Sequence, residues 1–187
     1  MDTAGKAVFT ERFAWFLEST DIKNAVLHMD DFHNPADRRR AGANEIEAYY
    51  QNAFDYEKVR TEILDPLRRD GTLDRDVLCL SLDTDRYEVR RRFSVGADTV
   101  LLIEGVLLFR EPLLPYFDGT IFYRSALTRC FDAPVSRRYQ YTAKRYIDQY
   151  IPVQRRYLEE CDPARRCDVV IDNGDDRSPK IISRIRA

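Results

Sequence analysis

Three acidic residues follow short apolar runs, and this placement suits chemistry on a hydroxyl group. Asp30 and Asp31 come soon after the run 25–27, and Glu104 follows the run 99–103. Acids at the carboxyl ends of neighbouring strands in an α/β sheet lie at the edge where ligands bind. Two carboxylates held close together repel unless a cation or a substrate proton lies between them. We therefore expect phosphoryl transfer with Mg²⁺, in which one carboxylate accepts the hydroxyl proton and another holds the metal through water.

A partial phosphate-binding loop stands at the N-terminus. Gly5-Lys6 opens a helical pattern, as in the motif Gly-x-x-x-x-Gly-Lys-Ser/Thr, whose backbone N–H groups and lysine bind phosphates. Ala7 occupies the position of the hydroxyl that binds Mg²⁺, and the first glycine of the motif would fall before Met1. The dipeptide alone is weak evidence, because a surface lysine after a glycine is common. We expect that Met1 is a misassigned start inside the loop.

Composition excludes several classes of function. The net charge of -2 provides no field that would attract a nucleic acid. No apolar run is long enough to cross a membrane and no signal peptide is visible, so a cytoplasmic location is expected. The four cysteines form no Cys-x-x-Cys pair, which favours reduced structural thiols. His28 and His33 lie near carboxylates, but Mg²⁺ held with phosphate oxygens explains these acids better than zinc does.

The surrounding patterns predict one α/β domain over residues 1–187, with a parallel sheet flanked by helices. Period-two alternation indicates an antiparallel hairpin inserted at about 76–95, and a helical lid is expected at about 129–150. Helices are predicted at 8–17, from an Asn44 cap with Glu47, from an Asp55 cap to about Gly71, and at 124–132, 134–150 and 153–161. Buried strands are predicted at 25–29, 99–103, 121–123 and 169–171, and a polar loop at 34–42.

Five ordered segments resemble the uridine kinase and phosphoribulokinase family of P-loop kinases, especially its short bacterial uridine kinase-like members. The segments are His28-Met29-Asp30-Asp31-Phe32-His33, Tyr49-Tyr50-Gln51-Asn52-Ala53-Phe54-Asp55-Tyr56, Leu101-Leu102-Ile103-Glu104-Gly105-Val106-Leu107-Leu108-Phe109, Arg145-Tyr146 through Tyr150-Ile151-Pro152-Val153-Gln154 with Tyr157, and Asp168-Val169-Val170-Ile171-Asp172-Asn173. Together with Gly5-Lys6 the resemblance covers nearly the whole chain.

The resemblance implies transfer of a phosphoryl group from ATP, with Mg²⁺, to a small-molecule hydroxyl, most simply that of a nucleoside such as uridine. Asp30 would be the general base, and Lys6 would act on the transferred group. The roles implied for the other positions are nucleotide binding by Gly5, Lys6, Ala7, Arg137 and Arg138, substrate binding by His33, Asp55, Tyr50 and Arg145, and metal binding by Glu104 and Asp30. His33 replaces the tyrosine common in the family. ATP and the substrate are the expected partners, and a homo-oligomer stays open.

Three departures from the family pattern keep alternatives open. The first strand and the front of the phosphate loop are missing, Ala7 lacks the metal-binding hydroxyl, and Phe131-Asp132 stands where relatives carry Arg-Asp. One alternative is a degenerate P-loop protein that binds a nucleotide or a partner without catalysis. Another is a kinase for a different alcohol, such as a sugar phosphate or a pantothenate-like compound. Tyr50 could pack in the core or contact a ligand, and 38–40 is read mainly as a solvated loop.

Overall fold

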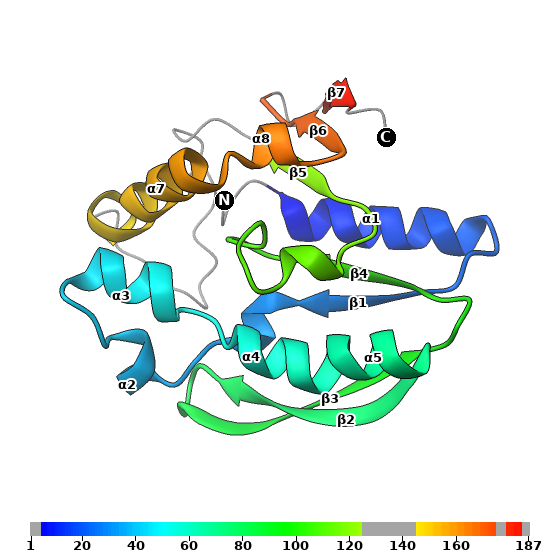
Figure 1. Ribbon diagram of the computed structural model, residues 1–187, viewed down its shortest axis with the longest axis horizontal. Helices are drawn as coiled ribbons and strands as arrows, with labels where there is room; N and C mark the ends of the chain where they lie inside the picture. The colour runs from blue at the N-terminus through cyan, green and yellow to red at the C-terminus, as the bar shows by residue number, and fades with distance from the viewer. Residues whose placement is uncertain (1–4, 125–144, 175–178, 185–187) are drawn as a thin grey trace. The chain divides into compact units, whose positions relative to one another are not determined.

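The computed structural model describes residues 5–124, 145–174 and 179–184, and it has an α/β fold with parallel strands flanked by helices (Figure 1). The chain divides into two compact units. Unit 1 comprises 1–6 and 106–187, and unit 2 comprises 7–105. No helix among the described residues combines the length and apolar character needed to cross a membrane.

Unit 2 is built on two parallel strands, β1 (Asn24–His28) and β4 (Val100–Glu104). Their register pairs His28 with Glu104 at the carboxyl ends. Helix α1 (Lys6–Ser19), which begins in unit 1 and continues in unit 2, runs along this pair, and Asn24 Nδ2 donates to the carbonyl oxygen of Ala14 at 3.0 Å. The predicted helix at 8–17 and strand at 25–29 are therefore present with shifted ends.

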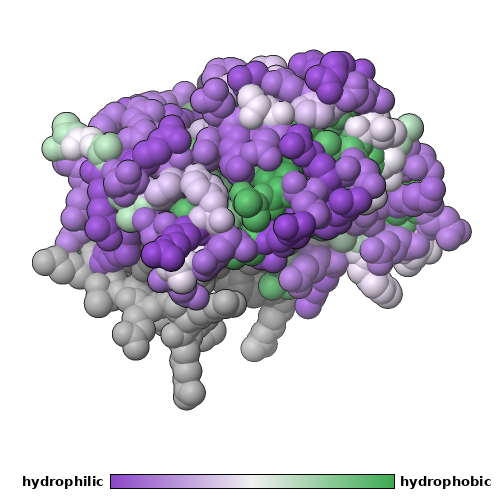
Figure 2. Space-filling view, turned by 90° about the horizontal axis from the view of Figure 1, so that it is seen from below, coloured by the Kyte–Doolittle hydropathy of each residue, from purple (hydrophilic) through white to green (hydrophobic). Residues whose placement is uncertain are grey.

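The predicted hairpin is present and longer than expected. Strands β2 (Leu73–Ser81) and β3 (Arg86–Val95) pair antiparallel, with a register shift between Cys79 and Leu80. Its outer face carries ion pairs, among them Arg90 with Asp76 at 3.0 Å. Seen from the hairpin side, the surface is mostly hydrophilic with smaller hydrophobic areas between (Figure 2). The inner face holds the buried Val77, Cys79 and Phe93 together with Arg91, which pairs with Val77 in the strand register. The alternation in sequence therefore predicts part of the set of residues that face the core.

Helical segments connect β1 to the hairpin. They are η1 (Met29–Phe32), α2 (Ala36–Arg39), α3 (Glu45–Asn52), α4 (Tyr56–Val59), the π-helical η2 (Arg60–Leu64) and α5 (Asp65–Asp70). The caps follow prediction: Asn44 Oδ1 accepts from Glu47 N at 2.9 Å, and Gly71 ends α5 in the left-handed conformation. The prediction of a loop over 34–42 is wrong in part, because the middle of this segment forms the single helical turn α2.

The π-helical segment η2 has a cause in the sequence. Pro66 follows η2 and does not fit into a regular α-helical turn. Its ring would clash with the carbonyl group of Glu62, four residues earlier. The helix widens there, and the Arg75 guanidinium donates to the Glu62 carbonyl oxygen at 3.3 Å. The arginine thus satisfies a carbonyl that the proline leaves without its helical partner.

Unit 1 contains β5 (Ile121–Arg124), β6 (Val169–Asp172) and β7 (Lys180–Arg184). Strand β6 pairs parallel with β5 and antiparallel with β7, a strand that the sequence reading missed. Among the described residues of unit 1, the helical segments are η3 (Leu114–Tyr116), the π-helical η5 (Tyr146–Tyr150), α7 (Ile151–Cys161) and α8 (Pro163–Arg166). The buried Tyr157 of α7 accepts from Phe109 N at 3.1 Å through its hydroxyl oxygen, which holds the loop after β4.

The predictions for Arg124 and for the burial of the strand at 99–103 differ from the structure. Arg124 ends strand β5 and does not begin a helix. Strand β4 is parallel, as predicted, but it is not covered on both faces, since Val100 is exposed and the rest of the strand is half-buried. The predicted helices and lid between 125 and 144 lie outside the described residues.

Candidate functional site

The turn after β1 presents its two acids outward. In η1 the side chains of Met29 and Phe32 are fully buried, and these anchors leave the intervening Asp30 and Asp31 on the outer side of the turn. The Asp30 carboxylate is 63% exposed. A carboxylate in this position can meet a ligand that approaches the carboxyl end of β1.

Asp31 forms a bidentate ion pair with Arg91 of strand β3. Arg91 Nε donates to Asp31 Oδ2 and Arg91 Nη2 to Asp31 Oδ1, both at 2.8 Å. The hydrogen bond that Arg91 donates to Asp31 is the main reason that the pKa of Arg91 is raised. Both carboxylate oxygens of Asp31 are therefore engaged, which supports a structural role for Asp31 and leaves Asp30 as the more accessible acid of the two.

Glu104 ends strand β4 and is paired with His28 of the neighbouring strand. His28 Nδ1 and Glu104 Oε1 are 2.7 Å apart, and the glutamate side chain is only 12% exposed. The hydrogen bond to Glu104 is the largest cause of a raised pKa at His28, opposed by desolvation, and the charges of Glu104, Asp31 and Asp30 add to the increase. The pair fixes the Glu104 carboxylate at the edge of the sheet.

His33 lies beside Asp30 with a defined tautomer. Its Nδ1 is 2.9 Å from the carbonyl oxygen of Ala53, and because a carbonyl only accepts, Nδ1 carries the proton. Its Nε2 lies 3.9 Å from Asp30 Oδ1, beyond hydrogen-bond distance. The ring stacks on Phe54 with centroids 4.5 Å apart. The backbone and the aromatic ring together orient the imidazole edge near the carboxylate.

Asp55 is brought to the same region by backbone pairing. Its N–H donates to the carbonyl oxygen of Phe32 at 2.8 Å, and His33 and Phe54 form an isolated antiparallel bridge. Asp55 Oδ1 caps α4 by accepting from Lys58 N at 3.0 Å. The predicted cap is therefore confirmed, and the same backbone contacts place this second acid beside the turn that carries Asp30.

The second oxygen of Asp55 faces a cation. Asp55 Oδ2 lies 3.8 Å from Arg38 Nη1, and the Asp55 side chain is 15% exposed, whereas Arg38 is well exposed. Tyr50, in contrast, is 2% exposed in the core, which favours the packing role that the sequence left open. Arg38, read mainly as a solvated loop residue, thus lies beside one of the predicted site acids.

Gly5 and Lys6 belong to unit 1. Gly5 has φ +83°, a left-handed conformation that glycine adopts without strain, directly before α1 begins at Lys6. A Cβ at Gly5 would lie 3.5 Å from Asn173 Nδ2 and 4.0 Å from Tyr123 Cε1. The dipeptide therefore lies near residues that end or follow β5 and β6, and it opens a helix, as the motif requires.

The remaining predicted site residues divide between described and undescribed segments. Arg145 precedes η5 and donates to Gln149 Oε1 at 3.1 Å, with its guanidinium 5.6 Å from the Tyr150 ring centroid. Ala7 lies in the first turn of α1 and is exposed. Arg137 and Arg138 lie outside the described residues.

The donor set suits a metal that takes few protein ligands. No group of three or more His, Cys, Asp or Glu side chains able to hold a metal ion occurs in the described part of the chain. Mg²⁺ in kinases is usually bound by one or two carboxylates together with phosphate oxygens and water. Asp30 and Glu104 fit that pattern, with one Glu104 oxygen already bound to His28.

Sequence reasoning missed the partners of the acids. His28 had a detectable signal, because two predicted parallel strands ending at His28 and Glu104 bring these residues into register. Arg91 had no detectable signal in the sequence, because it is one of three consecutive arginines and lies 60 residues from Asp31.

Comparisons with known proteins support the fold. No family model matches the chain, and no curated protein matches it. A solved structure titled "Structure of a Possible Uridine Kinase from Bacillus stearothermophilus" matches with a TM-score of 0.69 and 24% identity, covering 89% of this chain and 82% of that one. A "putative fructose transport system kinase" from Silicibacter sp. matches at a TM-score of 0.43 and 18% identity, covering 87% and 77%. The first match shows that the chain shares the fold of that structure.

Proposed function

We propose that this protein transfers a phosphoryl group from ATP to a hydroxyl group of a small molecule, with a nucleoside such as uridine as the first candidate acceptor. The observation that carries the proposal is the grouping of Asp30, His33 and Asp55 in one backbone-paired region, with Glu104 at the carboxyl end of the neighbouring strand. The fold match to a possible uridine kinase supports the same reaction class.

Each acid has a distinct part in this proposal. Asp30, which is accessible, accepts the proton of the attacking hydroxyl, and His33 frames its side. Asp55 would bind a second hydroxyl of the acceptor through Oδ2, which lies 3.8 Å from Arg38 Nη1, since Oδ1 caps α4. Glu104 and Asp30 would hold Mg²⁺, which supplies charge neutralisation on the phosphates. Lys6, at the start of α1 after Gly5, would contact phosphate oxygens.

The decisive experiment measures transfer from γ-labelled ATP to a panel of acceptors by the full chain. The panel contains uridine, cytidine, a pentose phosphate and pantothenate. In the variant Asp30→Asn we expect kcat to fall by about 10²–10⁴-fold, the usual contribution of a general base, with KM for ATP little changed. Asp98→Asn is the matched control, because Asp98 is also exposed and pairs only with Lys23 among the contacts described.

The panel separates the alternatives. Turnover retained in Asp30→Asn would remove Asp30 from the role of base. Transfer to the pentose phosphate or pantothenate, but not to a nucleoside, would change the acceptor class. The second candidate function, nucleotide binding without catalysis, is favoured by Ala7 in place of the metal-binding hydroxyl. Binding of ATP with no transfer to any acceptor would establish it.

A further inference from the structure

The segment 29–39, which we call the acceptor segment, carries Asp30, His33 and Arg38 and is attached to the hairpin at two places. The first attachment is at its beginning, where Arg91 of β3 holds Asp31 through two hydrogen bonds of 2.8 Å. Beside this ion pair the rings of Phe32 and Phe93 pack with centroids 6.1 Å apart. Polar and apolar contacts thus join the same short turn to the same strand.

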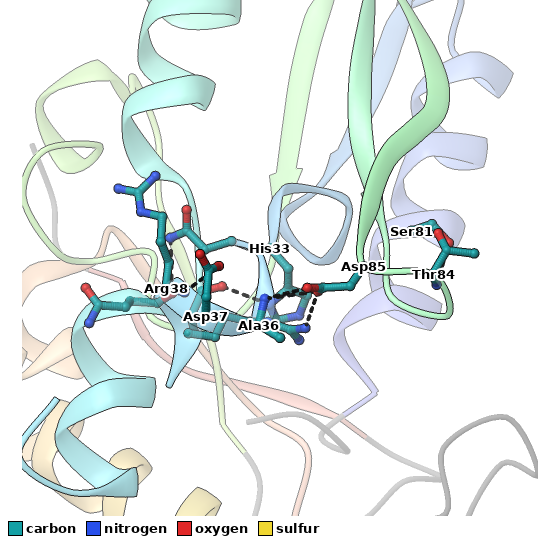
Figure 3. A network of polar contacts seen from close by, with 11 residues as sticks. His33, Ala36, Asp37, Arg38, Ser81, Thr84 and Asp85 are labelled. Carbon is teal, nitrogen blue, oxygen red and sulfur yellow. Dashed lines mark hydrogen bonds and ion pairs between the residues drawn. The ribbon is translucent and has the colours of Figure 1, made fainter. Parts of the chain in front are cut away.

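The second attachment is at the far end of the segment and comes from the hairpin turn. Asp85 accepts from Ala36 N through both carboxylate oxygens, each at 3.0 Å, and from Arg39 Nη2 at 3.1 Å (Figure 3). This carboxylate therefore binds the first turn of α2, between His33 and Arg38 in the chain. Asp85 itself has φ 56°, an uncommon conformation for a residue other than glycine.

These attachments matter because the turn that they hold carries the Asp30 side chain. Asp30 precedes Asp31 in η1 and its carboxylate is 63% exposed, so a movement of the turn backbone would move this carboxylate with it. A shift of about 1 Å in a reacting group can cost a factor of 10² in rate. A two-stranded hairpin that binds the segment near both of its ends would limit such shifts.

We propose that the β2–β3 hairpin is a clamp for the acceptor segment, and that Arg91 and Asp85 are positioning residues that act through Asp31 and Ala36 on the placement of Asp30. The expected effect of the clamp on kcat rests on the proposed function. The clamp itself is a property of unit 2 alone and can be measured without any substrate.

Amide hydrogen exchange of the full chain tests the clamp. Two reporters follow the Arg91 attachment: the Asn34 N–H, bonded to the Ala53 carbonyl, and the Asp55 N–H, bonded to the Phe32 carbonyl. In Arg91→Gln we expect their protection to fall at least tenfold, with amides in β1 unchanged. The matched control is Arg90→Gln, because Arg90 is the preceding residue of β3 and pairs with Asp76 on the outer face.

The Asp85 attachment has its own reporter, the Ala36 N–H. Asp85→Gly removes the carboxylate and keeps the left-handed backbone without strain, so a loss of protection at Ala36 reports the contact and not a damaged turn. We expect at least a tenfold loss there. Unchanged protection of the reporters in Arg91→Gln and Asp85→Gly would overturn the proposal, as would a loss spread over the whole of unit 2.

Kinetics test the positioning role. With the best acceptor, we expect Arg91→Gln to lower kcat about tenfold, with KM for ATP within about twofold. Asp31→Asn should have the same effect, and the double variant should be no worse than either, because the two residues act as one pair. Lower protection of the reporter amides together with an unchanged kcat would overturn the positioning role. Absence of any turnover in the wild type would refute the proposed function, while the exchange data would still decide the clamp.

Discussion

At the scale of single residues, the three acids at the ends of β1 and β4 differ more clearly in their surroundings than in their positions in the sequence. Glu104 is largely buried and bonded to His28, Asp31 is held by Arg91, and Asp30 is exposed. Three carboxylates that look alike in sequence thus differ in how far they can meet a ligand. Asp30, the most exposed of the three, is the acid that a substrate hydroxyl can reach.

The His28–Glu104 pair makes stability depend on pH. Because the folded pKa of His28 is raised above 6.5, the folded chain binds more protons than the unfolded chain as pH rises past that value. The stabilisation from His28 is therefore complete below the unfolded pKa and is lost as pH rises through the folded pKa. In His28→Gln, urea unfolding between about pH 5.5 and 8.5 should show a flatter pH dependence over this window.

The same pair can be measured directly. The chain has two histidines, so the imidazole Cε1–H signals in an NMR titration are readily assigned to His28 and His33. Glu104→Gln removes the largest cause of the shift and should lower the pKa of His28. An unchanged His28 titration in this variant would show that the pair does not form in solution.

At the scale of elements, tight packing behind the acid-bearing turn explains the glycine after β4. A Cβ on Gly105 would lie 2.5 Å from Met29 Cβ and 2.8 Å from its Cγ. Met29 is fully buried and belongs to the turn that carries Asp30, so it cannot move away without moving that turn. The glycine in the sequence Glu104-Gly105 therefore has a packing reason as well as a place in a motif.

We expect Gly105→Ala to lower the free energy of unfolding by about 1–3 kcal/mol, the usual cost of forcing added volume into a packed interior. Urea denaturation measures this change. Gly119→Ala is the control, since a Cβ there meets nothing within 4 Å, and it should change stability by less than about 0.5 kcal/mol. Equal free energies of unfolding for the two variants would show that the turn can move aside at little cost in stability.

The elements themselves were largely predictable, because their signals are local. The Asn44 and Asp55 caps, Gly71 and the period of two in the hairpin each act within a few residues. The short turn α2 was not predictable in the same way, because its first N–H is held by Asp85, which lies 49 residues away. Elements that depend on a distant side chain leave little trace in the neighbouring sequence.

At the scale of the whole molecule, the fold class was predictable and the pairing of distant charges was not. Apolar runs that end in acids indicated parallel strands, and the fold match confirms the class. The partner of Asp31 could not be chosen from the run Arg90, Arg91 and Arg92 until the strand register showed which side chain faces inward. Charge pairing at long range depends on this register, and a shift of one residue would reverse it.

The proposed nucleotide site predicts that ATP stabilises the whole chain. A ligand at about 100 times its Kd adds about 2.7 kcal/mol to the free energy of unfolding. For a chain of this length that corresponds to a rise in Tm of about 5–10 °C. Because Lys6 is expected to contact the phosphates, Lys6→Met should remove most of the rise, whereas Lys23→Met, which removes a surface ion pair with Asp98, should keep it. Thermal unfolding with and without Mg-ATP measures the effect, and an identical Tm in millimolar nucleotide would mean that the Gly5-Lys6 turn does not bind ATP in this chain.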